Sequence, residues 1–196
     1  MQSLSKKRLL VLVTVTLVLT AVTATAESIR SDQFQLNFPS WCGKVNKQEQ
    51  SVPSPSGNLS VVTYTGKTAE GACILSYSEF SGVIKDPDAT IRNGRTEFLR
   101  SLGIKATVNR ETERRVSGFP GQTFTFSAAE PRPIFGRTDL IVAGKRLYQL
   151  VYVGFSPESL SQAESSELFQ SLTVKVPEKA PSSQQAKANA APNTAE

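Results

Sequence analysis

The feature that most limits the fold of this chain is its succession of strand-like segments joined by very short turns. The clearest pair covers 134–143 and 146–153, and Gly144 begins the two-residue turn between them. Glycine in this position suits a type II′ hairpin, which joins antiparallel strands. A second pair, 59–65 and 72–80, is also separated by a glycine-containing turn. The sequence therefore predicts a central antiparallel β-sheet, because parallel strands need long crossover connections.

Two segments interrupt these strands with the features of a helix start. In each, a proline lies beside a side chain that can accept hydrogen bonds from the free amides of the first helical turn. Asp86 or Asp88 provides that side chain in the first segment, and Ser156 provides it in the second. The predicted helices cover 87–102 and about 157–171. An antiparallel sheet with two helices is typical of an α+β domain.

The remaining strand-like regions differ in how they distribute apolar residues. Apolar and polar residues alternate over 34–38, as in a strand with one buried face. We interpret 27–33 as a short polar lead. Residues 44–58 are polar and contain two prolines, so we expect a loop or a poorly formed hairpin there. The strand at 146–153 has apolar residues on both faces, which predicts that both sides of the sheet centre are covered.

The first 26 residues have the pattern of a cleavable export signal. Three basic residues at 6–8 precede an apolar run at 9–22, and Ala-Thr-Ala at 24–26 offers the small residues that a signal peptidase recognises. The run is shorter than the roughly 20 residues needed to span a bilayer. We therefore predict a signal peptide at 1–26 and an exported protein. The periplasm is the expected compartment, with the thylakoid lumen and the extracellular medium as alternatives.

The rest of the chain divides into one domain and a tail. Residues 27–176 are enough for a single domain with a full hydrophobic core. Residues 177–196 are rich in Pro, Ser, Gln, Ala and Asn. Such a segment cannot bury enough apolar surface to offset its loss of conformational entropy. We predict that it is disordered.

The charge balance argues against a nucleic acid partner. The whole chain has 22 Lys and Arg against 17 Asp and Glu, a net charge of +5. Three of the basic residues lie in the predicted signal peptide, which leaves 19 against 17, or +2. Nucleic acid binding needs a concentrated basic surface, and this small excess does not predict one.

Cysteine and histidine usage limits the chemistry further. Cys42 and Cys73 are an even pair that remains after signal cleavage, which favours one disulfide in an oxidising compartment; two free thiols are the alternative. The chain has no histidine. This excludes Ser-His-Asp and Cys-His catalysis and histidine-ligated zinc.

Two groups of residues are candidates for binding. The densest charge cluster contains Arg110, Arg114 and Arg115, and it predicts either a docking surface for an acidic partner or a solvated edge strand protected by its charges. Arg132 and Arg137 flank a proline-rich bend and could hold a small anion, with simple solvent exposure as the alternative.

The second group is aromatic, and its members could form the walls of a ligand pocket. Core packing beneath a helix is the alternative fate of such side chains. The residues of this predicted pocket are Trp41, Phe119, Tyr148 and Tyr152.

Three parts of the sequence together resemble one family. They are FQLNFPSW at 34–41, GFPGQTFTF at 118–126 followed by GKRLYQLVYVG at 144–154, and ELFQSL at 167–172. In this order they resemble the PsbP/Mog1-like group, which includes many exported bacterial proteins. The resemblance spans about 34–175. It implies an αβα sandwich, in which a central antiparallel sheet has helices on both faces.

The resemblance also implies a binding or accessory role, because the photosystem II extrinsic protein of this group is an assembly and stabilising subunit. The sequence has no Walker A, GxGxxG, GxSxG or HExxH motif, and we predict a non-enzymatic protein without a cofactor. We expect it to dock on an envelope or membrane-associated protein complex, with peripheral membrane association. The alternative is a carrier of a small ligand or metal ion, with a pocket between the sheet and the helix at 87–102.

Overall fold

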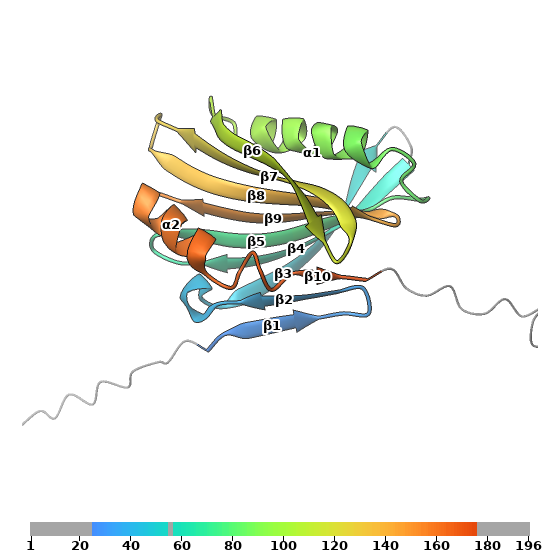
Figure 1. The fold of residues 1–196 in the computed structure, drawn as a ribbon, viewed down its shortest axis with the longest axis horizontal. Helices are drawn as coiled ribbons and strands as arrows, with labels where there is room; N and C mark the ends of the chain where they lie inside the picture. The colour runs from blue at the N-terminus through green and yellow to red at the C-terminus, as the bar shows by residue number, and fades with distance from the viewer. Residues whose placement is uncertain (1–24, 55–56, 176–196) are drawn as a thin grey trace, which may run out of the picture.

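The computed structural model describes residues 25–54 and 57–175. The predicted disordered tail, and all of the predicted signal peptide except its last two residues, lie outside this part of the chain. Within it the protein forms a seven-stranded sheet, a three-stranded sheet and two helices (Figure 1). The paired strands are antiparallel throughout the described ranges, so the predicted antiparallel α+β class is confirmed.

The seven-stranded sheet has the strand order β3-β4-β5-β9-β8-β7-β6. Both predicted hairpins are confirmed as β4–β5 and β8–β9, and Gly144 has the positive φ of 61° that its turn requires. The strands are β3 (Val45–Ser54), β4 (Gly57–Lys67), β5 (Gly71–Glu79), β6 (Thr107–Val116), β7 (Phe119–Ala128), β8 (Ile134–Ala143) and β9 (Arg146–Gly154).

The region 44–58 is more regular than its sequence predicts. It contains β3, which pairs with β4 from Val45 opposite Gly66 to Ser54 opposite Gly57. The alternative of a loop was therefore wrong, whereas the alternative of a hairpin fits the antiparallel pair of β3 and β4, which is regular rather than poorly formed. Pro53 is tolerated because β3 is the edge strand of the sheet, so its missing N–H costs no hydrogen bond to a further strand.

The smaller sheet brings the two ends of the described chain together (Figure 1). It consists of β1 (Glu27–Arg30), β2 (Phe34–Phe38) and β10 (Thr173–Val174), with β2 in the middle. The strand predicted at 34–38 is confirmed. The polar lead is not a simple lead, because β1 pairs with β2 along its whole length. One face of β2 is apolar and buried, through Phe34, Leu36 and Phe38.

The two helices begin where the sequence predicts. Asp86 caps α1 (Pro87–Ser101) by accepting a hydrogen bond from the Ala89 amide, 2.9 Å away. Ser156 caps α2 (Pro157–Ser165) in the same way.

The second helix is six residues shorter than the predicted end at Ser171. Ser166 adopts an extended backbone, with φ −80° and ψ 167°, and its hydroxyl accepts a hydrogen bond from the Leu168 amide. This turn directs Leu168, Phe169 and Leu172 into the core.

Two hydrophobic clusters cover the faces of the seven-stranded sheet. On one face, α1 packs Ile91 and Phe98 against Phe124 and Phe126. The other face is covered by the three-stranded sheet together with α2 and the segment after it. The predicted αβα sandwich is therefore not confirmed in that form, because β-structure makes up much of this second layer.

The structure joins Cys42 and Cys73 in a disulfide, with a Cα–Cα distance of 5.8 Å. Cys42 ends a single 3₁₀ turn, Ser40–Cys42, directly after β2, and Cys73 lies in β5. The bond therefore links the region of the small sheet to the large one. In the described residues, neither helix is long and apolar enough to cross a membrane.

Candidate functional site

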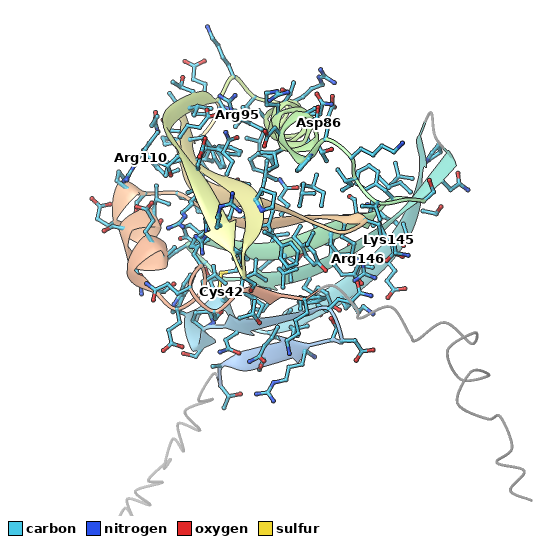
Figure 2. All side chains as sticks on the ribbon, turned by 45° about the vertical axis from the view of Figure 1, so that its right-hand side comes forward. Cys42, Asp86, Arg95, Arg110, Lys145 and Arg146 are labelled. Carbon is cyan, nitrogen blue, oxygen red and sulfur yellow. A yellow bond between two sulfur atoms is a disulfide. The ribbon has the colours of Figure 1, made fainter. Side chains whose placement is uncertain are left out.

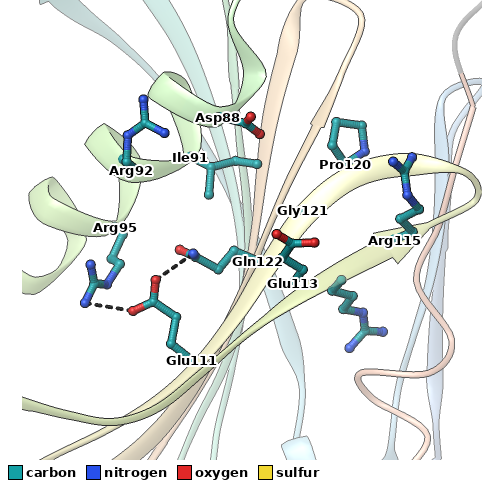
Figure 3. Close-up of a pocket in the computed structure, with 11 residues that line it drawn as sticks. Asp88, Ile91, Arg92, Arg95, Glu111, Glu113, Arg115, Pro120, Gly121 and Gln122 are labelled. Atoms are coloured by element: carbon teal, nitrogen blue, oxygen red, sulfur yellow. Dashed lines mark hydrogen bonds and ion pairs between the residues drawn. The ribbon is translucent and has the colours of Figure 1, made fainter.

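A charged groove of about 670 Å³ lies between α1 and the edge strand β6. It exists because α1 packs over β7, β8 and β9 and leaves the outer edge of the sheet uncovered. Figure 3 shows the side chains that line it. From α1 these are Asp88, Arg92 and Arg95, and from β6 they are Glu111, Glu113 and Arg115.

The inner side of the groove is closed by a short polar network. Arg95 forms an ion pair with Glu111 at 2.9 Å, and the Gln122 amide donates to the same carboxylate at 2.6 Å (Figure 3). These contacts fasten α1 to β6. Within the described part of the chain, Arg95 Nε and Gln122 Oε1 are buried without a hydrogen-bond partner. Both atoms mark the inner end of the groove as polar.

The outer side of the groove carries charges that remain available. Arg92, Asp88 and Glu113 form no ion pair in the ranges that the structure describes. Toward the described residues, Arg115 donates only to the Gly118 carbonyl, at 3.0 Å. The charges of these side chains are therefore not neutralised by ion pairs within the described part of the chain.

The predicted arginine surface is divided between two faces of the sheet. Side chains alternate along β6 after an irregularity between Val108 and Arg110. Arg115 therefore lines the groove beside α1, whereas Arg110 lines a second cavity on the opposite face. Arg114 is on that opposite face too and is held by an ion pair with Asp139.

Asp139 is the central group of this opposite face and is not among the site residues predicted from the sequence. Its side chain is 1% exposed and contacts Arg114 and Arg137, the latter at 3.1 Å. Thr123 donates a hydrogen bond to it at 2.9 Å. Its position could have been noticed in the sequence, because an acidic residue within the apolar strand 134–143 indicates a buried carboxylate. Buried carboxylates are rare unless they are paired with a positive charge.

Both arginines also hold the segment that follows α2. Arg114 donates to the Phe169 carbonyl, and the Arg137 guanidinium lies over the Phe169 ring, 4.1 Å from its centre. Arg137 is 15% exposed, so the alternative of simple solvent exposure was wrong. Burial lowers the pKa of the Arg114 guanidinium below its ordinary value, and the charge of Arg137 adds to this shift while Asp139 opposes it.

The predicted aromatic pocket residues lie together in the packed core. Tyr148 and Tyr152 are 1% and 3% exposed, and the Trp41 ring meets Tyr152 edge-on at 5.7 Å between centres. Phe119 packs against the same cluster. They face α2 and the small sheet, whereas the groove beside α1 is lined mainly by charged side chains.

No group of three or more Cys, Asp or Glu side chains that could hold a metal ion occurs among residues 25–54 and 57–175. The carboxylates of the groove are spread over α1 and β6 and lie next to arginines. The donors that a hard cation such as Ca²⁺ needs are therefore not gathered there.

Comparison with known proteins gives a likeness of fold. Neither the scan of protein-family models nor the search of curated proteins found a match. Among solved structures, cyanobacterial PsbP (CyanoP) from Synechocystis sp. PCC 6803 matches with a TM-score of 0.54. The fold is PsbP-like. The match covers 80% of this chain and 96% of that one at 12% identity. The resemblance to Mog1 stays a prediction.

Two further structures show weaker likeness to this PsbP-like chain. A protein of unknown function from Pseudomonas aeruginosa matches with a TM-score of 0.40 and 12% identity, covering 87% of this chain and 99% of that one. A protein from Bacteroides thetaiotaomicron VPI-5482 matches with a TM-score of 0.45 and 14% identity, and the match covers 76% of this chain and 47% of that one.

Proposed function

We propose that this protein is an exported, non-enzymatic accessory protein that binds a protein partner through the groove between α1 and β6. One observation carries the proposal: the groove opens at an exposed sheet edge and presents charged side chains that the fold itself does not use. Arg92 and Arg115 supply its free positive charge, and Asp88 and Glu113 supply its free negative charge. The partner segment that fits the groove therefore carries acidic side chains opposite the two arginines and basic side chains opposite the two carboxylates.

The character of the groove favours a protein partner over the alternative of a small-ligand or metal carrier. Pockets for small molecules are mostly apolar, with a few polar groups that fix orientation. Here the walls are mainly charged, and Ile91 is one of few apolar side chains among them. Complementary charge across an interface mainly provides specificity and fast association, as an accessory protein requires.

Export is supported by three independent features. The N-terminal 26 residues have the signal-peptide pattern. The Cys42–Cys73 disulfide fits an oxidising compartment. The PsbP-like fold is shared with a cyanobacterial PsbP. We place the protein in the periplasm, with the thylakoid lumen and the medium as alternatives, acting on an envelope or membrane-associated complex.

Affinity purification of the tagged protein from the envelope fraction of its source organism tests the groove directly. The double variant Arg92→Glu/Arg115→Glu reverses both free positive charges. We expect it to recover at least about tenfold less of the partner that the wild type recovers, because two contacts become repulsive. Quantitative mass spectrometry of the bound proteins measures the difference.

The matched control is Lys44→Glu/Lys67→Glu, which changes net charge equally at exposed positions outside the groove. It is expected to retain the partner. Equal recovery with both double variants would contradict the proposal, as would the absence of any partner specific to the wild type. Thermal unfolding of all three proteins shows that the variants are folded.

A further inference from the structure

A second polar surface lies on the face of the sheet opposite the groove. The cluster that covers this face is apolar at β5 and β9 but gives way to polar side chains toward the β6 edge. There, a cavity of about 300 Å³ opens beside α2. We call this surface the polar platform, and it consists of Arg110, Thr112, Arg114, Thr123, Thr125 and Arg137.

Strand register places these side chains in adjacent rows. Arg110 lies opposite Thr125, which lies opposite Arg137. In the next row, Thr112 lies opposite Thr123, which lies opposite the buried Asp139. Directly opposed residues on one sheet face have Cβ atoms about 5 Å apart, so the groups of the platform can reach one small ligand together.

Beneath the platform, positively charged groups outnumber negatively charged ones. One carboxylate, that of Asp139, serves two guanidinium groups, those of Arg114 and Arg137. Both arginines are partly withdrawn from water, with side chains 22% and 15% exposed. An unbalanced positive charge at such a position is stabilised by an anion, because attraction is stronger where water is excluded.

Arg110 adds a third guanidinium, and the fold does not use it. Its side chain makes no hydrogen bond or ion pair with any residue that the structure describes, and it lines the same cavity. Figure 2 shows Arg110 on the side of α2, well apart from Arg95 beside α1. Each guanidinium has five N–H donors in a planar fork, and threonine hydroxyls can donate as well.

Glu113 and Glu164 also line this cavity, but the alternation along β6 directs the Glu113 side chain to the groove face. The carboxylate of Glu164 forms no ion pair with an arginine of the platform in the described structure. It stands at the rim and opposes the entry of an anion. Its presence makes binding moderate in strength and provides a sensitive test of its electrostatic origin.

We propose that the polar platform binds a small oxyanion, a phosphate or carboxylate group, between Arg110, Arg137 and the hydroxyls of Thr112 and Thr125. The Asp139 carboxylate holds Arg114 and Arg137 in place from below. Arg114 also donates to the Phe169 carbonyl, whereas Arg137 uses Nε and Nη2 toward Asp139 and keeps Nη1 for the ligand. This site is separate from the partner groove, since the two lie on opposite faces of the sheet.

The test is a titration of ¹⁵N-labelled protein, followed by NMR, with inorganic phosphate in one arm and succinate in the other. We expect saturable shifts centred on Thr112, Thr123 and Thr125, with a dissociation constant of about 1 mM, typical of a weak single-group ligand. The arm with the tighter binding identifies the class of oxyanion.

Two variants test the assignment of the residues. Arg110→Gln removes a guanidinium that forms no hydrogen bond or ion pair with the described residues, so we expect the fold to be retained and binding to be roughly tenfold weaker. Glu164→Gln removes an opposing charge and is expected to tighten binding. The control Lys67→Gln removes an exposed positive charge elsewhere and is expected to leave binding unchanged.

Absence of saturable shifts in both arms would overturn the proposal. So would equal weakening by Arg110→Gln and Lys67→Gln, because that result would indicate only general attraction to a positive protein. The outcome is distinguishable from that of the partner experiment, whose substitutions lie at Arg92 and Arg115 on the other face.

Discussion

At the scale of single residues, Asp139 has an unusual position in this protein. Among the described residues, it is the only charged residue that is buried. Its carboxylate is compensated by Arg114, Arg137 and Thr123, which come from three neighbouring strands. These contacts connect β6, β7 and β8, and through Phe169 they also fix the segment after α2.

The substitution Asp139→Asn keeps the shape of this side chain and removes its charge. We expect the free energy of unfolding to fall by about 3–5 kcal/mol, because two partly buried guanidinium groups lose their counter-charge. Urea denaturation at neutral pH measures the change. The comparison is Glu97→Gln, which breaks the exposed ion pair with Arg100 and is expected to cost less than about 1 kcal/mol. Equal costs would contradict this account of Asp139.

At the scale of secondary-structure elements, local chemistry determines where the elements begin. The turn at Gly144 and the caps at Asp86 and Ser156 each depend on a few consecutive residues. These features were therefore predictable from the sequence. The end of α2 was not, because it depends on burial of Leu168 and Phe169 against distant strands.

The capping of α1 gives a prediction at this scale. The sequence allows Asp86 or Asp88 as the cap, and the structure selects Asp86. Asp86→Ala is expected to lower the free energy of unfolding by about 1 kcal/mol, since the Ala89 amide loses its partner.

Asp88→Ala serves as the control for this prediction. It removes only an attraction between a first-turn carboxylate and the helix dipole, so its expected cost is about 0.3–1 kcal/mol. Chemical denaturation of both variants checks the order. A larger cost for Asp88→Ala would show that the cap is misassigned.

The edge strand β6 illustrates the limit of pattern-based reasoning about the site. Its charges predict an exposed strand, and the structure confirms its place at the edge of the sheet. The same charges take different roles on the two faces. Arg115 lines the partner groove, whereas Arg114 is engaged with Asp139 and Phe169. Those partners lie 25 and 55 residues away in sequence, and no local pattern indicates them.

At the scale of the whole molecule, the disulfide joins two parts that share few backbone hydrogen bonds. The small sheet and the seven-stranded sheet have no strand in common, and they meet through apolar packing and the Cys42–Cys73 bond. The bond closes a loop with a sequence separation of 31 residues. Such a crosslink lowers the entropy of the unfolded chain more than that of the native state.

Reduction of this bond is expected to lower the free energy of unfolding by about 3–4 kcal/mol. Urea denaturation with and without dithiothreitol measures the loss. The variant Cys42→Ala/Cys73→Ala provides the control, because its unfolding should be insensitive to the reductant. If the reductant destabilises this variant as much as the wild type, the effect does not come from the disulfide.

The sequence by itself determined the antiparallel class, the hairpins, the helix starts and the pairing of Cys42 with Cys73 as a candidate disulfide. Turn geometry, capping and alternation act over a few residues, and a single even pair of cysteines leaves one intramolecular connection. Only the tertiary structure decided that β1 pairs with β2, that a small sheet covers one face of the large one, and that Asp139 forms ion pairs with two arginines. It also decided where α1 leaves the sheet edge open. These features arise from packing between segments far apart in the chain, where burial and charge compensation outweigh local preference.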